Sequence, residues 1–208
     1  MKVRILLLAA GAFVAAAAGA CSGPTQPVAT HENIFDTAGV YALTGAPESG
    51  PTGVATLTLL ATNFYGPTPV RAVPGSHYDV VFDINGSTAV ALPPKLVGFT
   101  GQFTAALQES QQPYDSMTVA PTEGYSDSTS IVIHPGTRFY VQSVTSNPTC
   151  TAQSVAARRY IYSKFYIDSI NFSPYDPITS PNGRTIYYRM VVDPNCGFLG
   201  LDAGIPSE

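Results

Sequence analysis

Three carboxylates in one polar stretch, residues 111–130, are the side chains best suited to acid and base catalysis. Asp115, Glu123 and Asp127 are close enough in sequence for two of them to flank a glycosidic bond, as paired carboxylates do in most glycoside hydrolases. Acids in one loop also come close together without any catalytic role, and a solvated acidic loop is the stronger explanation. A carboxylate-dependent hydrolase therefore stays as an alternative function.

Motifs for nucleophilic catalysis, nucleotide binding and metal binding are missing from the sequence. It has no Gly-x-Ser-x-Gly, and no glycine-rich loop joins a predicted strand to a helix. His31, His77 and His134 lie far apart, and none belongs to a His-Glu-x-x-His motif. Asp79 and Asp83 would lie about 13 Å apart along a strand, too far to share a metal ion. We expect no enzyme, no cofactor and no metal site.

Tyrosines alternate with apolar residues in the segment from Arg158 to Phe172. If Ile161, Phe165 and Ile167 face the core, the outer face of that strand and its neighbour carries Tyr160, Tyr162, Lys164, Tyr166 and Arg189. Exposed tyrosines beside a cation stack on sugar rings or anchor a protein partner. Cross-strand pairing, or burial under a loop, explains the same tyrosines without any ligand. We therefore treat these residues as a candidate binding face for a glycan or a protein.

The amino terminus has the order of a secretory signal. Lys2 and Arg4 precede an apolar and small-residue run from Ile5 to Ala20, shorter than the ~20 strongly apolar residues of a comfortable membrane span. The run ends in Ala18-Gly19-Ala20-Cys21. This ending resembles the lipobox of bacterial lipoproteins.

The resemblance implies a lipid anchor. In that family the cysteine thiol receives a diacylglyceryl group, the signal peptide is removed just before it, and the new amine is acylated, with palmitate as a usual chain. Cys21 would then hold the protein on a membrane through two or more acyl chains, enough for stable anchoring. Ser22 in the next position resembles the outer-membrane sorting class, so the expected location is the bacterial cell envelope. An ordinary signal peptide with an Ala-x-Ala-like site is the alternative.

Cysteine parity suits an exported protein. With Cys21 acylated, Cys150 and Cys196 remain, and in an oxidising compartment we expect them to form a disulfide. Closing a loop of about 46 residues would contribute roughly 4 kcal/mol of stability. Two unpaired buried thiols are the alternative.

The composition favours a β protein and excludes a nucleic-acid partner. Charged residues are only 12%, while Gly and Pro number 18 each, Tyr 12 and Phe 10. The net charge of −4 becomes −6 when Lys2 and Arg4 are removed with residues 1–20, so the protein has no positive field for nucleic acid. The remaining 188 of the 208 residues suffice for one domain.

The chain divides into three parts: a signal peptide over residues 1–20, a lipidated N-terminus with a flexible tether over 21–39, and a single β domain over 40–208. Within that domain, alternation predicts a half-buried strand over residues 54–63 and a hairpin over 77–92, with a type I′ turn at Asn85-Gly86. A second turn is expected at Pro135-Gly136. The two longest strands are expected over residues 158–172 and 185–193. Short helices are expected over residues 102–111 and 151–158.

Frequent strands separated by Pro, Gly and Asn turns predict an antiparallel β-sandwich, immunoglobulin-like in architecture, with one or two short helices. A closed β-barrel is the alternative. The function expected from all these features is that of a non-enzymatic cell-envelope lipoprotein with a structural or ligand-binding role. A barrel that carries a lipid or another small apolar ligand is the second alternative, beside the hydrolase.

Overall fold

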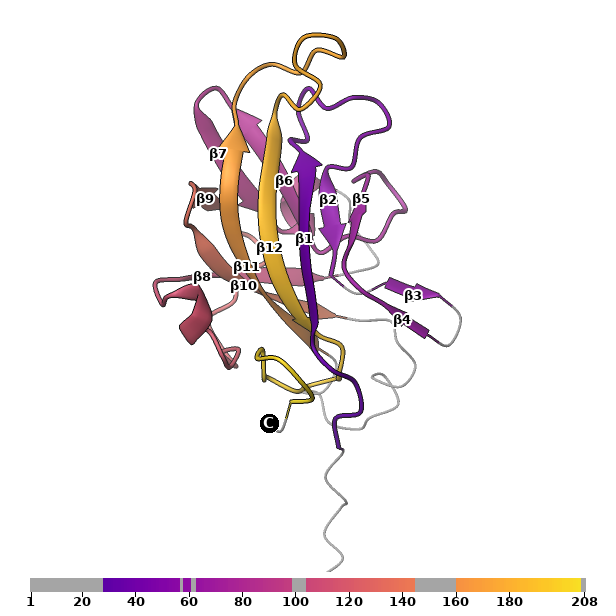
Figure 1. Ribbon diagram of the computed structural model, residues 1–208, viewed down its shortest axis with the longest axis vertical. Helices are drawn as coiled ribbons and strands as arrows, with labels where there is room; N and C mark the ends of the chain where they lie inside the picture. Colours follow the sequence, from indigo (N-terminus) through magenta and orange to yellow (C-terminus); the bar gives the residue numbers. More distant parts are fainter. Residues whose placement is uncertain (1–27, 57, 61–62, 99–103, 145–159, 207–208) are drawn as a thin grey trace, which may run out of the picture.

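A computed structural model describes residues 28–56, 58–60, 63–98, 104–144 and 160–206. Two five-stranded antiparallel sheets pack face to face in these ranges, as the sequence predicts (Figure 1). The described strands do not close into a barrel, so the barrel alternative is wrong. Each sheet has five strands, compared with four and three in constant-type immunoglobulin domains, so the resemblance to those domains concerns the two-layer architecture.

Sheet A has the strand order β1-β12-β11-β10-β8, and sheet B has the order β5-β2-β6-β7-β9. A separate hairpin, β3-β4, is the third sheet. The strands and 3₁₀ helices are β1 (Ile34–Tyr41), β2 (Gly53–Ala55), β3 (Thr58–Leu60), β4 (Asn63–Tyr65), β5 (Thr68–Val70), β6 (Val80–Asn85), β7 (Thr88–Leu92), η1 (Pro94–Val97), β8 (Ala105–Ser110), η2 (Tyr114–Ser116), β9 (Ile131–Ile133), β10 (Arg138–Val144), β11 (Tyr160–Asn171) and β12 (Thr185–Asp193).

The main hydrophobic core fills the space between the two sheets. Phe82 of sheet B lies between Phe139 and Tyr188 of sheet A, with ring centroids 6.4 and 5.8 Å away. Phe139 and Phe165 stack at 5.0 Å, and all four rings are fully buried. These inward residues come from every second position of their strands, because successive side chains of a strand point to opposite faces. The two long strands predicted over residues 158–172 and 185–193 are confirmed as β11 and β12.

The hairpin β6-β7 is confirmed, with a different turn from the predicted one. Asn85 pairs with Thr88, so the loop residues are Gly86 and Ser87. Gly86 has a φ of 60°. Ser87 does not have a positive φ, because Arg184 is the only non-glycine residue with one in the described ranges. A type I′ turn needs positive φ at both central residues, so one glycine at the first position matches type II′ instead. The Pro135-Gly136 turn is also present, and there the chain crosses from sheet B to sheet A.

Two local predictions are wrong. Residues 105–110, inside the predicted helix over 102–111, form β8, because pairing with β10 buries Ala105 and Leu107 on the core face and overrides the helix preference of Ala, Leu, Gln and Glu. The predicted strand over 54–63 is divided into β2 and β3, because Thr56 turns its amide to the carboxylate of Asp79 instead of continuing the ladder. The helix predicted over 151–158 lies outside the described residues.

The tether predicted over residues 21–39 is wrong for the described part of that range. Residues from Ile34 onward belong to β1, which pairs with β12 along eight residues. Ala29 and Asn33 are buried, so the chain is already part of the fold before the first strand. Figure 1 shows this first segment beside the C-terminal tail, at the end of the sandwich opposite the loop between β11 and β12.

Candidate functional site

The predicted tyrosine face exists, and its centre is covered. Tyr160, Tyr162, Lys164 and Tyr166 of β11 all point away from the main core, as the alternation predicts. Tyr162 and Lys164 are only 4% exposed, and Tyr160 and Tyr166 are half-buried. Chain segments around Met117 and Leu201 form a second, smaller core over this part of sheet A. Burial under a loop, the alternative left open above, therefore applies to Tyr162 and Lys164.

Lys164 is a buried cation with a defined partner. Its Nζ donates a hydrogen bond to the backbone oxygen of Met117 at 2.9 Å and lies 4.9 Å from the centre of the Tyr114 ring. Burial lowers the pKa of Lys164, although the carboxylates of Asp202 and Asp115 act in the opposite direction. Such contacts hold the covering segment on the sheet, so Lys164 has a structural explanation.

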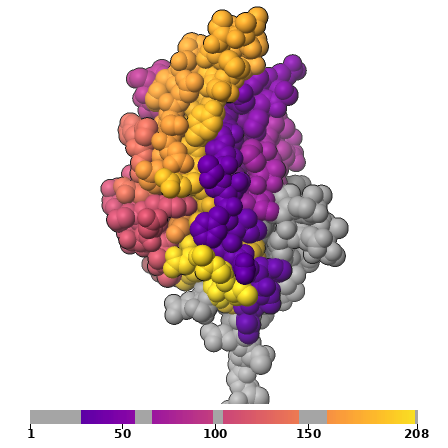
Figure 2. Space-filling view, in the orientation of Figure 1, coloured from indigo at the N-terminus to yellow at the C-terminus, as the bar shows by residue number. Residues whose placement is uncertain are grey.

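Arg189, the fifth residue of the predicted face, is exposed at its edge. Its guanidinium lies 4.4 Å from the Tyr166 ring centre and 2.9 Å from a carboxylate oxygen of Asp168. Tyr187, on the same face of β12, is 37% exposed, and its ring lies over Gly39 of β1. Figure 2 views the molecule from this side, with β1 in indigo running beside the orange and yellow of β11 and β12.

A recess of about 380 Å³ lies at the other edge of the covered area. Tyr160 and Tyr125 line it, and each ring packs against Tyr162, with centroids 6.4 and 6.2 Å away. Polar and small apolar side chains complete the lining. The polar members are Thr104, Ser126, Asp127, Ser128 and Gln142, and the apolar members are Ala105, Ala106 and Val144. Burial raises the pKa of Tyr125, so its ring carries a neutral hydroxyl. No sequence pattern predicts this recess, because its walls come from three strands and a distant loop.

Of the three carboxylates considered for catalysis, one lines the recess. Asp115 and Glu123 are exposed, and neither lines the recess. Asp127 lines it, and its carboxylate accepts a hydrogen bond from Lys95 at 2.9 Å, which holds the pKa of this acid below its usual value. The exposed ion pair with Lys95 favours the ionised form of Asp127, which suits hydrogen bonding and opposes a role as general acid.

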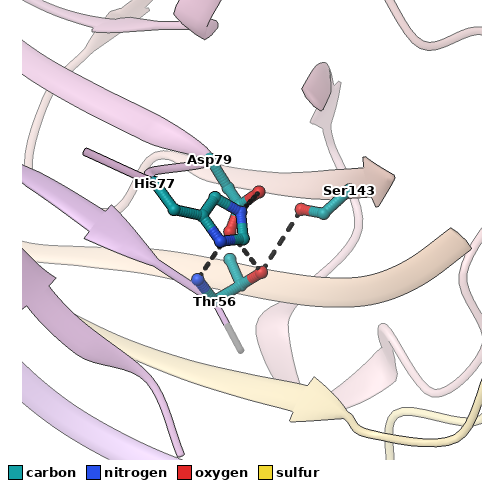
Figure 3. Close-up of polar contacts among 4 residues, drawn as sticks. All are labelled: Thr56, His77, Asp79 and Ser143. Carbon is teal, nitrogen blue, oxygen red and sulfur yellow. Dashed lines mark hydrogen bonds and ion pairs between the residues drawn. The ribbon is translucent and has the colours of Figure 1, made fainter. Parts of the chain in front are cut away.

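A second polar cluster lies between the sheets (Figure 3). The buried Asp79 carboxylate accepts hydrogen bonds from the backbone N–H and the hydroxyl of Thr56, at 2.7 and 2.8 Å, through one of its oxygens. The other oxygen lies 3.4 Å from Nε2 of His77. The Thr56 hydroxyl donates its only hydrogen to the Asp79 carboxylate. In the contact between Thr56 and Ser143, at 3.2 Å, the Ser143 hydroxyl is therefore the hydrogen-bond donor and the Thr56 oxygen is the acceptor.

The order of these contacts differs from that of a catalytic triad. In a triad the imidazole lies between the carboxylate and the hydroxyl. Here the carboxylate lies between the imidazole and the hydroxyls, which are 1% and 4% exposed. His77 gains a raised pKa because its bond and charge contact with Asp79 outweigh the effect of burial, whereas those contacts lower the pKa of Asp79 despite its burial. The cluster therefore connects Thr56, the residue that follows β2, to Ser143 of β10 in the opposite sheet.

His31 and His134 are exposed and lie apart from this cluster. Within the described ranges no group of three or more His, Cys, Asp or Glu side chains could hold a metal ion. Cys196 is buried in the main core and is not a free side chain. Cys150 and Cys21 lie outside the described residues, so the bridge between Cys150 and Cys196 and the acylation of Cys21 stay predictions.

Comparison with known proteins leaves the family open. No protein-family model, curated protein or solved structure shows a significant match to the chain. Among the described residues no helix is long and apolar enough to cross a membrane. Function therefore has to be argued from the site itself.

Proposed function

We propose that the protein is a non-enzymatic lipoprotein of the bacterial cell envelope, and that its β-sandwich binds a glycan in the recess between Tyr125 and Tyr160. The observation that carries the binding proposal is the combination of two tyrosine rings and several polar side chains around one recess of about 380 Å³. The order Lys2, Arg4, apolar run and Cys21 supports the anchor, and Ser22 supports the outer membrane as its location.

The dimensions of the recess suit a small ligand. Small-molecule sites commonly measure about 300–1,000 Å³, and this recess falls near the lower limit. A mono- or disaccharide fits that size, whereas a protein partner would need a broad contact surface. Of the two partners that the sequence left open, the recess favours the glycan.

The chemistry of the lining also matches a sugar. A pyranose ring has an apolar C–H face that packs on tyrosine, and hydroxyls around its rim that need hydrogen-bond partners. Gln142 and Ser126 offer amide and hydroxyl groups, and the ionised Asp127 offers acceptor oxygens. Gln142 is already oriented, because its amide nitrogen lies 3.2 Å from the Tyr162 hydroxyl and donates to it.

Binding is tested with soluble fragments of peptidoglycan and of lipopolysaccharide, titrated by calorimetry. The Tyr160→Ser variant should weaken binding about fivefold or more, since a lost aromatic contact costs on the order of 1 kcal/mol. Tyr187→Ser is the matched control, because this tyrosine is on the same side of sheet A and outside the recess. Equal affinity of the Tyr160→Ser variant and the wild type, or no binding of any fragment, would refute the glycan proposal.

Anchoring is tested separately with the Cys21→Ser variant. The wild type should incorporate labelled palmitate and fractionate with membranes, whereas the variant should be found uncleaved or soluble after export. Fractionation of the variant with membranes, together with no label in the wild type, would exclude a lipid anchor.

The disulfide is tested by peptide mapping without reductant, which should show Cys150 joined to Cys196. Alkylation of both thiols in the native protein would exclude that bridge.

A further inference from the structure

The N-terminal strap, residues 28–33, is bound to the C-terminal tail, residues 194–206. The Asn195 side chain holds it from both sides: its oxygen accepts from the backbone N–H groups of Thr30 and His31, at 2.8 and 3.0 Å, and its amide donates to His31 O at 2.8 Å. The Asn33 amide donates to two carbonyls of the tail, those of Gly200 and Asp202, at 2.8 and 2.6 Å. The strap is therefore part of the fold.

This strap places one end of the sandwich close to the lipid anchor. Six residues, 22–27, separate Cys21 from Val28. Even a fully extended chain covers at most about 25 Å over those seven Cα–Cα steps. A tether that ran to residue 39 would have allowed more than twice that distance. The strap leaves the domain little freedom to move away from the membrane.

The same end exposes apolar side chains. Val28 is 81% exposed, Ile205 56% and Val119 48%. Val119 and Ile205 line one recess of about 270 Å³. Its other lining residues are the apolar Ala203 and Pro206, Gly200, and the polar Asn33, Thr118 and Asp202. The strand-like contact between Val119 and Gly200 joins the covering segment to the tail at this point. Apolar residues gathered at one end of a domain mark a surface for a nonpolar partner.

We infer that this end of the domain, bearing Val28, Val119 and Ile205, rests on the surface of the lipid bilayer that holds the acylated Cys21. The inference depends on the proposed anchor, since three side chains are too few to hold a soluble domain on a membrane. Attachment through Cys21 supplies the high local concentration that makes such a weak contact persist.

Charge indicates how the contact is made. The strap, the tail and residues 117–124 contain no Lys or Arg, while Glu32, Glu123 and Asp202 are exposed acids. Attraction to anionic lipid therefore contributes nothing, and insertion of the apolar side chains between headgroups is the interaction that remains. On a lipid without net charge the contact should be insensitive to salt, because neither an attraction nor a repulsion between net charges is there to be screened.

The chain contains no tryptophan, so a single introduced tryptophan reports its own surroundings. Val119→Trp and Ile205→Trp place the reporter in the proposed contact. Ile178→Trp is the matched control, because Ile178 is 88% exposed in the loop between β11 and β12, at the opposite end of the sandwich (Figure 1). Each full-length lipidated variant is reconstituted in phosphatidylethanolamine vesicles, with or without bromine on the acyl chains near the headgroup.

Emission of the Val119→Trp and Ile205→Trp variants should shift to the blue and be quenched by the brominated lipid, at low and at high salt alike. Emission of the Ile178→Trp variant should not change. Circular dichroism of each variant shows that it is folded, which is expected at exposed positions. Quenching in the control as well would mean that the domain has no fixed orientation, and would overturn the inference.

Flotation of the same vesicles separates this inference from the anchor. If the protein floats with the vesicles and neither test variant is quenched, the domain is held away from the lipid, and the inference is wrong while the anchor stands. If the protein reconstituted with the vesicles does not float with them at all, both the anchor and the contact are wrong.

Discussion

Replacing Asp193 with asparagine should remove a destabilisation of the fold that increases with pH. Asp193 ends β12 and is fully buried. One carboxyl oxygen accepts from the backbone N–H and the side-chain amide of Asn195, at 2.8 and 2.7 Å. The other has no hydrogen-bond partner among the described residues. Burial raises the pKa of Asp193 to about 7, and the two bonds from Asn195 oppose that rise.

The sign follows from which state holds the proton. Between pH 3.8, the ordinary pKa of this carboxyl, and about 7, the folded protein keeps a proton that the unfolded chain has released. The stabilisation from this bound proton is complete below the pKa that Asp193 has in the unfolded chain. It is lost as pH rises through the pKa that Asp193 has in the folded protein. At 1.36 kcal/mol for each pH unit, the whole interval corresponds to about 4 kcal/mol.

Urea unfolding of the Cys21→Ser protein, with and without Asp193→Asn, measures this contribution between about pH 4 and pH 8.5. Asparagine keeps an acceptor for both Asn195 bonds and cannot ionise, so the two proteins should have similar free energies of unfolding at the acid end. The asparagine variant should then become the more stable one by up to about 4 kcal/mol as pH rises. A difference that stays constant across this range would show that Asp193 titrates normally, and would refute the argument from burial.

Three further changes test the packing, each by urea unfolding at neutral pH. Asp79→Ala should lower the free energy of unfolding by about 3 kcal/mol or more, because the amide and hydroxyl of Thr56 lose their acceptor. Asp79→Asn should lower it much less, because the single amide oxygen can accept both bonds. Equal losses in the two variants would contradict this account. Tyr188→Phe should be neutral or stabilising by up to about 1 kcal/mol, since the buried Tyr188 hydroxyl has no partner among the described residues, and a clear loss would reveal one. Gly183→Ala should destabilise by about 1–3 kcal/mol because its Cβ would lie 2.2 Å from the Pro174 carbonyl oxygen; an unchanged midpoint would mean that this loop yields freely.

Local patterns in the sequence were enough to predict the architecture. Alternation with a period of two identified β6, β7, β11 and β12, because the pleat of a strand fixes which residues share a face. Frequent turn residues and abundant aromatic residues indicated a two-layer β protein. The outward direction of Tyr160, Tyr162 and Tyr166 was also predictable from this alternation.

What lies against each face depended on residues far away in the chain. Alternation showed that Tyr162 and Lys164 point outward, and only the fold showed that the Met117 and Leu201 segments cover them. Strand pairing with β10 determined that residues 105–110 are extended, against their local preference for helix.

The two ends of the chain show the same limit. Asn195 holds the strap through hydrogen bonds to residues more than 160 positions away. Residues 28–33 have no periodicity, so the sequence alone suggested a free tether. The recess beside Tyr160 is likewise formed by β8, β10, β11 and the loop that carries Tyr125. Sequence patterns report the direction of a side chain relative to its own backbone, whereas burial, contact and pKa depend on tertiary neighbours, which only the folded chain brings together.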